Sequence, residues 1–420
     1  MPFRQLADPS RSGAEPRRLL LGLYRDALAA VDGKAGVERA LRRRTIHGPV
    51  SLIAIGKAAG AMAEGACAAL GAAVAGGLVI SKAGHLDPER LARHGLEAMM
   101  GGHPLPTVES LAAGRRLLAF LEERGDAPLL FLISGGASSL VEVPAAGLGL
   151  AGLAQINRWL LASGLAITEM NLIRKAVSRI KGGGLLAWLG GRAVRALAIS
   201  DVPGDDPAVI GSGLLVPAPA LAAQVRGLDL PDWLRDWVEA GLSDRCAVSV
   251  RGAEIELVAT LAQAKQAAVD QAARLGLAVH LHPGLVAGDA AEQGRALARA
   301  LRVGAAGVHV WGGETTVRLP SDPGRGGRNQ HLALAAALEL AGGAGCYLLS
   351  AGTDGGDGPT EDAGALVDGT TVERAAGEGL DARDALRRAD SGTLLAATGD
   401  LIHTGPTGTN VMDLMLGLRR

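Results

Sequence analysis

Residues able to bind an anion interrupt a hydrophobic stretch that runs from Leu129 to Val143. The first five residues, Leu129 to Ile133, are all apolar, which is typical of a strand buried on both faces of a parallel sheet. Ser134-Gly135-Gly136-Ala137-Ser138-Ser139 follows at once. Glycines allow a sharp turn close to a ligand, and the serines supply hydroxyl and free N–H groups beside an expected helix start. We predict that this turn binds phosphate, with a plain strand-to-helix connection as the alternative.

Two lysines beside glycines could place a positive charge on the same kind of ligand. Lys57 follows the predicted strand Val50 to Ile55 in the turn Gly56-Lys57-Ala58-Ala59-Gly60. Its ammonium could act as a point charge over a phosphate or a carboxylate, with an exposed loop lysine as the alternative. Lys181 follows a predicted cationic helix and precedes Gly182 and two more glycines, which would let the backbone approach a ligand. The helix dipole also favours cations there, so a structural role stays open.

An arginine-rich loop is the third candidate for anion binding. Arg325-Gly326-Gly327-Arg328-Asn329-Gln330 presents two guanidinium groups and two side-chain amides at a predicted helix start. This combination suits a carboxylate or a phosphoryl group in transfer, because guanidinium groups form paired hydrogen bonds with both. A solvated loop with no ligand is the alternative.

An acidic loop could hold a metal ion. Four carboxylates lie among glycines between Ala351 and Asp362, after a predicted buried strand. Such oxygen-rich loops suit Mg²⁺, which takes one or two carboxylates together with substrate phosphates and water. Asp354 is the best single candidate, Asp357 lies in the same loop, and Glu314 and Asp201, each predicted just past a strand, could join the site. An acidic surface turn is the alternative.

Predicted strands and helices alternate along the first half of the chain, which indicates an α/β fold with a doubly wound parallel sheet. Ligands of such sheets bind outside the carboxyl ends of the strands, and Lys57, Ser134 and Asp201 all stand at such ends. The alternation weakens after Pro217, so we place a domain boundary near Asp244. The expected domains are residues 1–244 and a smaller α/β domain of residues 245–420. The five strands predicted for the first domain are Val50 to Ile55, Gly76 to Ser81, Leu96 to Met100, Leu129 to Ile133 and Ala193 to Ile199.

The composition of the 420-residue chain excludes several classes of protein. The net charge is −1, aromatic residues make up only 2%, and Lys and Arg are scattered, which argues against nucleic acid as a partner. Cys67, Cys246 and Cys346 form no CxxC pair, so we expect a reducing compartment and no cysteine metal site. No apolar stretch is long enough to span a membrane, and the first residues lack the apolar centre of a signal peptide. The expected location is cytoplasmic.

Nine sequence motifs, in one order, give the chain a resemblance to the class II glycerate 2-kinases, whose C-terminal module is named MOFRL and whose members often carry the label hydroxypyruvate reductase. The resemblance covers the chain from about Leu19 to its end. The motifs are IGKAAG at Ile55, GHPLP at Gly102, LISGGASSL at Leu132, IKGGG at Ile180, ISDVPGDDP at Ile199, GGETTV at Gly312, GRGGRNQ at Gly324, SAGTDGGDGPT at Ser350 and TGPTGTNV at Thr404.

The resemblance implies a large Rossmann-like N-terminal domain, a smaller C-terminal α/β domain and an active site in the cleft between them. It implies transfer of the γ-phosphoryl group of ATP to the 2-hydroxyl of D-glycerate, with Mg²⁺ as cofactor. The functional lysine of the family matches Lys57 and its arginine matches Arg328. Three positions depart from the family pattern, namely Ala176 in place of His, His331 in place of Glu and Met412 in place of Asn. These departures affect the expected fit of the substrate more than the class of reaction.

These expectations combine into one hypothesis for the site. Lys57 and Arg328 would neutralise the transferring group, and Asp201 would accept the hydroxyl proton. Asp354 with Glu314 or Asp357 would hold Mg²⁺. The candidate substrate-binding residues are Arg325 and Asn329, and the candidate nucleotide-binding residues are Ser134, Gly135, Gly136, Ser138, Ser139, Lys181 and Gly182.

Two other classes of function compete with the kinase. An NAD(P)H-dependent hydroxypyruvate reductase needs a dinucleotide-binding fingerprint. The chain offers only Gly147 to Gly152, which matches GxGxxG but is separated from the preceding apolar run by Pro144 and two alanines. A non-catalytic sensor of a sugar acid or nucleotide would keep the same loops without turnover. A homodimer is one assembly that the sequence leaves open.

Overall fold

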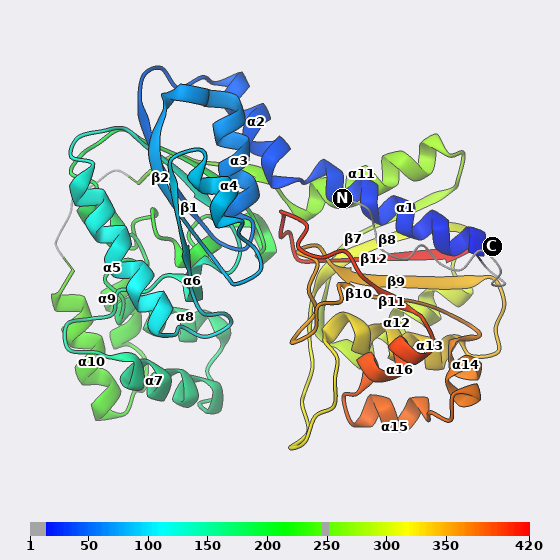
Figure 1. The fold of residues 1–420 in the computed structure, drawn as a ribbon. Coiled ribbons are helices and arrows are strands. Elements are labelled where there is room, and N and C mark those ends of the chain that lie inside the picture. Colours follow the sequence, from blue (N-terminus) through cyan, green and yellow to red (C-terminus); the bar gives the residue numbers. More distant parts are fainter. Residues whose placement is uncertain (1–13, 246–251) are drawn as a thin grey trace. The chain divides into compact units, whose positions relative to one another are not determined.

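The computed structural model of the protein describes residues 14–245 and 252–420. The chain divides into two compact units, one of Gly33–Val258 and the other of Met1–Asp32 with Ala259–Arg420 (Figure 1). This division differs from the expected boundary near Asp244. Strand β6 (Ile255–Ala259) is the last strand of the first sheet and does not begin the second. Helix α1 (Ala14–Ala30) belongs with the C-terminal part of the chain.

The first unit contains the predicted doubly wound parallel sheet. Its strand order is β3-β2-β1-β4-β5-β6, and the pairs β1–β2, β2–β3, β1–β4 and β4–β5 are parallel. This order is that of a Rossmann fold, which confirms the expected fold class. The strands preceding β6 are β1 (Val50–Ile55), β2 (Val74–Ser81), β3 (Leu96–Met100), β4 (Leu129–Ile133) and β5 (Val194–Ile199).

Both faces of this sheet are covered, because successive strand residues point to opposite sides. Ile53, Ile55 and Phe131 belong to one hydrophobic cluster with Leu117 and Phe120 of α5 (Val108–Glu123). Helix α3 (Ala59–Leu70) also contacts β1, β2 and β4. All six residues of β1 are buried, in agreement with the unbroken apolar character of the strand.

A second hydrophobic cluster of the first unit lies mainly among helices. It joins Leu153 and Ile156 of one helix to Ile173, Val225 and Leu234 of three others. These four helices are α7 (Leu150–Ala162), α8 (Ile167–Ala176), α9 (Leu221–Arg226) and α10 (Asp232–Ser243). The remaining helices of the unit are α2 (Gly33–Arg43), α4 (Pro88–Ala92) and α6 (Ala137–Leu140).

The second unit contains a mixed sheet with the order β11-β10-β9-β12-β8-β7. The pair β7–β8 is parallel, and the other four pairs are antiparallel. The central strands are almost wholly buried, which explains their apolar sequences. The strands are β7 (Val279–Asp289), β8 (Gly307–Thr316), β9 (Cys346–Gly352), β10 (Gly364–Asp368), β11 (Leu401–Ile402) and β12 (Asp413–Arg419).

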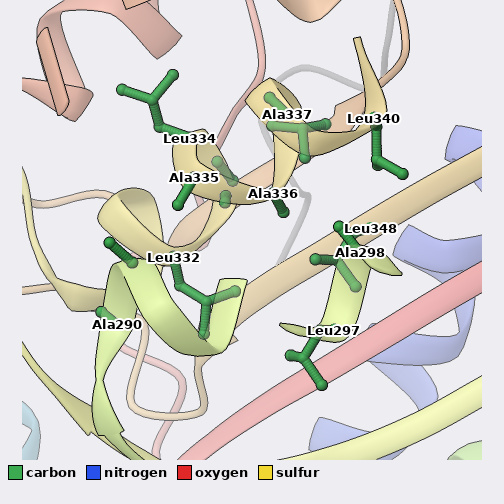
Figure 2. Packing of buried hydrophobic residues seen from close by; sticks show 14 of the residues in the cluster. Ala290, Leu297, Ala298, Leu332, Leu334, Ala335, Ala336, Ala337, Leu340 and Leu348 are labelled. Atoms are coloured by element: carbon green, nitrogen blue, oxygen red, sulfur yellow. The ribbon is translucent and has the colours of Figure 1, made fainter. Parts of the chain in front are cut away.

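Helices lie on both sides of this second sheet. Figure 1 shows α1 and α11 on one side and α12, α13 and α16 on the other. Figure 2 shows how Leu297 of α12, Leu332 and Leu340 of α13 and Leu348 of β9 gather in one hydrophobic cluster. The helices are α11 (Leu261–Arg274), α12 (Ala290–Val303), α13 (Arg328–Leu340), α14 (Thr371–Gly377), α15 (Ala382–Arg387) and α16 (Ser391–Ala397).

Helix α1 is attached to the second unit by polar contacts as well as by packing against α11. Arg17 is buried and donates to Asp368 at 3.0 Å and to Asp400 at 2.7 Å. The hydroxyl of Tyr24 donates to the carbonyl of Gly352 at 2.6 Å. These partners are more than 300 residues away in sequence, so nothing local in the sequence indicates where α1 packs.

Two observations bear on the expected location of the protein. No helix among residues 14–245 and 252–420 is both long and apolar enough to cross a membrane. Cys67 and Cys346 are buried free thiols. Cys246 lies outside the described residues, as does most of the N-terminal segment.

Candidate active site

Strands β1 and β4 are neighbours at the centre of the first sheet, where the strand order reverses direction. Ligands of open α/β sheets bind at the carboxyl ends of the strands beside such a reversal. Lys57 follows β1, Ser134 follows β4, and Asp201 follows the adjacent strand β5. The prediction that these residues stand at the carboxyl edge of one sheet is therefore confirmed.

Gly56 and Ser134 join the turns that follow β1 and β4. Gly56 has a φ of 131°, and a Cβ atom there would lie 2.2 Å from the hydroxyl of Ser134. The buried Ser134 hydroxyl accepts a hydrogen bond from the backbone N–H of Ala58 at 3.1 Å. Ser134 therefore connects the two turns, and its expected contact with a nucleotide stays a prediction.

The turn at Gly135 and Gly136 leaves backbone donors next to a lysine side chain without a partner among the described residues. The N–H of Lys57 donates to the carbonyl of Gly135 at 2.8 Å. Gly136 has a φ of 83°, and the Lys57 Cγ atom lies only 3.2 Å from where a Cβ atom of Gly136 would stand. None of the hydrogen bonds made by the described residues uses the N–H of Gly135, Gly136 or Ser138. Consecutive free N–H groups in such a turn form an anion-binding concavity.

A pocket of about 130 Å³ adjoins this turn and is lined by Ser138, Ser139 and Lys181. Lys181 is buried and forms an ion pair with Glu142, which is also buried. Glu142 accepts a further hydrogen bond from the hydroxyl of Ser178 at 2.6 Å. The charge of Lys181 is thus already balanced, so any contribution to phosphate binding comes from its remaining N–H donors and not from an unpaired charge.

Gly182 does not offer a donor to a nucleotide. It has a φ of 54°, and its N–H donates to the carbonyl of Ser212 at 2.9 Å. Its own carbonyl accepts a hydrogen bond from Arg245 at 2.9 Å. Both polar backbone groups of Gly182 are thus used within the first unit, and its expected nucleotide contact stays a prediction.

In the second unit, Arg328 lies at the start of α13 between two carboxylates. Its Nε and Nη2 atoms donate to the two oxygens of Asp413, at 2.6 and 2.9 Å. Its Nη1 atom forms an ion pair with Glu314 at 2.9 Å. Burial disfavours the charged guanidinium, but the attraction of Asp413 and Glu314 and the hydrogen bonds to Asp413 outweigh it, so the pKa of Arg328 is raised.

Asp413 and Glu314 occupy positions that sequence reasoning misjudged. Asp413 is fully buried at the first position of β12 and was missed, because it is one carboxylate in the apolar run from Val411 to Leu418. A lone carboxylate in a buried strand was the available signal, since such a charge needs a partner. Glu314 lies within β8 and not past its end, where it is partly exposed and pairs with Arg328.

Asp354 stands beside Asp413 across a glycine. A Cβ atom on Gly352 would lie 3.3 Å from Oδ1 of Asp354 and 3.4 Å from Oδ1 of Asp413. Both carboxylates also raise the pKa of Tyr24, although burial of the phenol is the larger cause. One Asp354 oxygen accepts the N–H of Gly356 at 2.9 Å. Two neighbouring carboxylates are the kind of ligand that Mg²⁺ takes besides phosphate and water, and both oxygens of Asp413 also accept from Arg328.

Asp357 and Asn329 form hydrogen bonds at the start of α13. Asp357 is buried, and its two oxygens accept the backbone N–H groups of Asn329 at 3.0 Å and Gln330 at 2.8 Å. Burial raises the pKa of Asp357 to about 7, against the opposing effect of these hydrogen bonds. The buried side chain of Asn329 accepts a hydrogen bond from Ser350 at 2.6 Å. The two residues stabilise the start of α13, and their expected contacts with a metal ion and a substrate stay predictions.

Arg325 is half-exposed and pairs with the buried Asp362 at 2.9 Å. Asp362 also lies 2.6 Å from His403. Within the described ranges, no group of three or more His, Cys, Asp and Glu side chains is arranged to hold a metal ion. Asp354, which lies beside Asp413, and Asp357 both stay predictions as ligands of Mg²⁺.

The geometry defines an α/β protein with a glycine turn of N–H groups, unpartnered in the described chain, at the switch point of a Rossmann-type sheet and an arginine held by carboxylates in a second unit. Two family models match the chain, a domain of unknown function (DUF4147) over residues 19–229 and the MOFRL family over residues 307–413. The chain belongs to the class II glycerate 2-kinase family, the family of the MOFRL module.

Relatives of known sequence and a solved structure are similar to this chain over nearly its whole length. The chain is 35% identical to the D-glycerate 2-kinase of Thermotoga maritima, covering 96% of this chain and 98% of that protein. It is 37% identical to a protein of Agrobacterium vitis that is provisionally named a hydroxypyruvate reductase, covering 95% and 93%. The crystal structure of glycerate kinase from Thermotoga maritima is similar with a TM-score of 0.83 and 33% identity, covering 96% of this chain and 99% of that one.

Proposed function

We propose that this protein is an ATP-dependent glycerate 2-kinase, which transfers the γ-phosphoryl group of ATP to the 2-hydroxyl of D-glycerate. The observation that carries the proposal is the position of Lys57 over the Gly135-Gly136 turn, at the switch point of the first sheet. A cation above free backbone N–H groups is suited to phosphates. The relatives named glycerate kinase, which match along almost the full chain, support the choice of reaction.

The first unit supplies the groups for the nucleotide in this proposal. The N–H groups of Gly135, Gly136 and Ser138 donate to phosphate oxygens, and Lys57 neutralises their charge. Ser138, Ser139 and Lys181 line the adjoining pocket and offer further donors. Phosphoryl transfer depends mostly on positioning and charge neutralisation, so such donors are what the reaction requires.

The second unit supplies a cation and a carboxylate pair. Arg328 stabilises the negative charge of the transferring group, and Asp413 keeps its guanidinium in one orientation. Asp354 and Asp413 are the residues that would hold Mg²⁺, which supplies charge neutralisation on phosphate oxygens when bound. Arg325 stays the candidate for the carboxylate of glycerate, because its side chain is half-exposed.

Asp201 is the proposed acceptor of the proton from the 2-hydroxyl of glycerate. It follows β5, the strand next to β4, and its side chain is partly exposed. A carboxylate that takes the proton of an attacking hydroxyl is the usual arrangement for phosphoryl transfer to an alcohol.

A hydroxypyruvate reductase is the second candidate, since the relative from Agrobacterium vitis has that name. A Rossmann-type reductase would have a glycine fingerprint in the turn after β1. That turn instead contains Lys57, and the GxGxxG match of Gly147 to Gly152 leads into α7, whose N-cap is Gly149. These observations favour the kinase.

One pair of assays separates the two candidates. The purified full chain is incubated with ATP, MgCl₂ and D-glycerate, and NMR of the product identifies the phosphorylated carbon. In parallel, NADH absorbance is followed with hydroxypyruvate. We expect ADP and 2-phosphoglycerate in the first assay and no change in the second. NADH oxidation without ADP release would reverse the assignment, and 3-phosphoglycerate as the product would contradict the regiochemistry.

We also propose a cytoplasmic location, because ATP and reducing conditions are both found there, in keeping with the isolated cysteines of the sequence. The proposed partners are D-glycerate and ATP, without nucleic acid or membrane. Assembly as a homodimer stays a prediction, which size-exclusion chromatography with light scattering can test.

A further inference from the structure

The second unit contains a cationic pocket that the proposed reaction does not use. Its volume is about 470 Å³, within the range of about 300–1,000 Å³ that is usual for sites of small molecules. Arg295 of α12, His331 of α13, Arg383 and Arg387 of α15, and Arg318 beyond β8 contribute to the lining. None of the groups that we assign to phosphoryl transfer lines it.

The charge of the pocket is positive. Glu339 is the one carboxylate in the lining, and it already pairs with Arg299 at 3.5 Å and Arg302 at 3.7 Å, both outside the pocket. Arg387 pairs with Asp384. By contrast, Arg295, Arg318 and Arg383 take part in no ion pair formed by the part of the chain that the structure describes. Three guanidinium groups around one concavity therefore lack a counter-charge.

His331 gives the pocket a buried polar group as well. Its side chain is only 8% exposed, yet it contributes to the lining. Its Nδ1 atom is buried and has no hydrogen-bond partner among the described residues. His331 therefore adds an imidazole to the arginines that line the pocket.

We propose that this pocket binds the phosphoryl group of a small solute, either free phosphate or a phosphate monoester. Guanidinium groups form paired hydrogen bonds with phosphoryl oxygens, and several of them around one site suit a dianion. An imidazole N–H of His331 can donate to the same oxygens. The proposal stands on the second unit alone and does not depend on the proposed kinase activity.

The test uses the histidine as a local reporter. The full chain is labelled with ¹³C in the histidine rings, and the C2–H resonance of His331 is assigned by its absence in H331Q. Sodium phosphate and glucose 6-phosphate are titrated separately in the absence of ATP. We expect a saturable shift of the His331 resonance, and the arm with the tighter binding shows whether free phosphate or an ester is the preferred source.

Two charge variants decide whether the shift comes from the pocket. R318A/R383A removes two exposed arginines of the lining and should weaken binding by about ten-fold or more. R93A/R115A removes two exposed arginines of the first unit and should leave phosphate binding unchanged. The proposal is overturned if neither probe shifts His331 saturably, or if both double variants bind as the unmodified protein does.

Discussion

Arg328 binds both oxygens of Asp413, a carboxylate 85 residues further along the chain, with donor distances of 2.6 and 2.9 Å. Asp413 is fully buried, so the guanidinium is its compensating charge. The pairing fixes the plane of the guanidinium, while Nη1 pairs with Glu314. Catalysis by charge stabilisation requires donors that are positioned before the reaction, and this contact provides that positioning.

Replacing Arg328 should affect activity and stability by separable amounts. R328K keeps the charge but loses the paired hydrogen bonds, so we expect kcat to fall by about 10²-fold or more with a folded protein. R328A leaves Asp413 buried without a partner and should also reduce the free energy of unfolding by about 3–5 kcal/mol. R328A/D413N should recover stability but not kcat. Steady-state kinetics with ATP and D-glycerate and urea unfolding measure the two effects, and a near-normal kcat in R328K would contradict the proposed role.

Lys57 should be needed for turnover but not for folding. K57A removes the point charge beside the Gly135-Gly136 turn, so we expect kcat to fall by about 10²-fold or more. K57R should recover only part of the lost kcat, because a guanidinium differs in geometry from an ammonium. K34A, on α2, is the control and should leave both kcat and the melting temperature unchanged. Normal turnover in K57A would remove the lysine from the mechanism.

The contact between Gly56 and Ser134 predicts a steric effect on stability. G56A would place Cβ 2.2 Å from the Ser134 hydroxyl at a φ of 131°, so strain and overlap add. G84A has a comparable φ of 80° but meets no atom within 4 Å, so it isolates the backbone strain, which costs about 1–2 kcal/mol. We expect G56A to lower the free energy of unfolding clearly more than G84A does. Equal losses in urea unfolding would show that the two turns move apart without cost.

Asp354 should control the dependence of the reaction on Mg²⁺. D354N removes one charge from the carboxylate pair, so the Mg²⁺ concentration for half-maximal rate should rise by about ten-fold or more. E361Q removes an exposed carboxylate from the same loop and serves as the control. The measurement is initial rate against MgCl₂ at fixed ATP. Equal Mg²⁺ dependence in D354N and the control would assign the metal to other residues.

A stack of histidines in the second unit predicts a loss of stability in acid. His282 and His309 lie 3.1 Å apart between ring nitrogens, and burial lowers the pKa of both below 6.5. The unfolded chain therefore binds more protons than the folded one below about pH 6.5, and stability should fall as the pH falls through that value. The melting temperature of H282Q should decrease less between pH 7 and pH 5 than that of the unmodified protein. H47Q, at an exposed position, should show the full decrease.

Local features of the sequence were sufficient for strands β1 to β5 of the first sheet, but not for assigning β6 to it. The run from Leu129 to Ile133 and the glycines after it predict a buried strand and a sharp turn, and β4 has the predicted bounds. Lys57 and Asp201 were placed correctly for the same reason, because a strand end is visible wherever an apolar run meets polar residues. The motifs beyond Gly312 indicated the family but not the partners of their side chains.

The sequence by itself therefore determined the strands, the turns at their ends and the family. Only the tertiary structure decided which charges meet, since Arg328 and Asp413, Lys181 and Glu142, and Arg17 and Asp368 are each separated by tens to hundreds of residues. It also showed that Asp357 accepts the backbone N–H groups of Asn329 and Gln330 at the start of α13. The physical reason is that strand and turn preferences act between neighbours in sequence, whereas the pairing of buried charges depends on how distant segments pack.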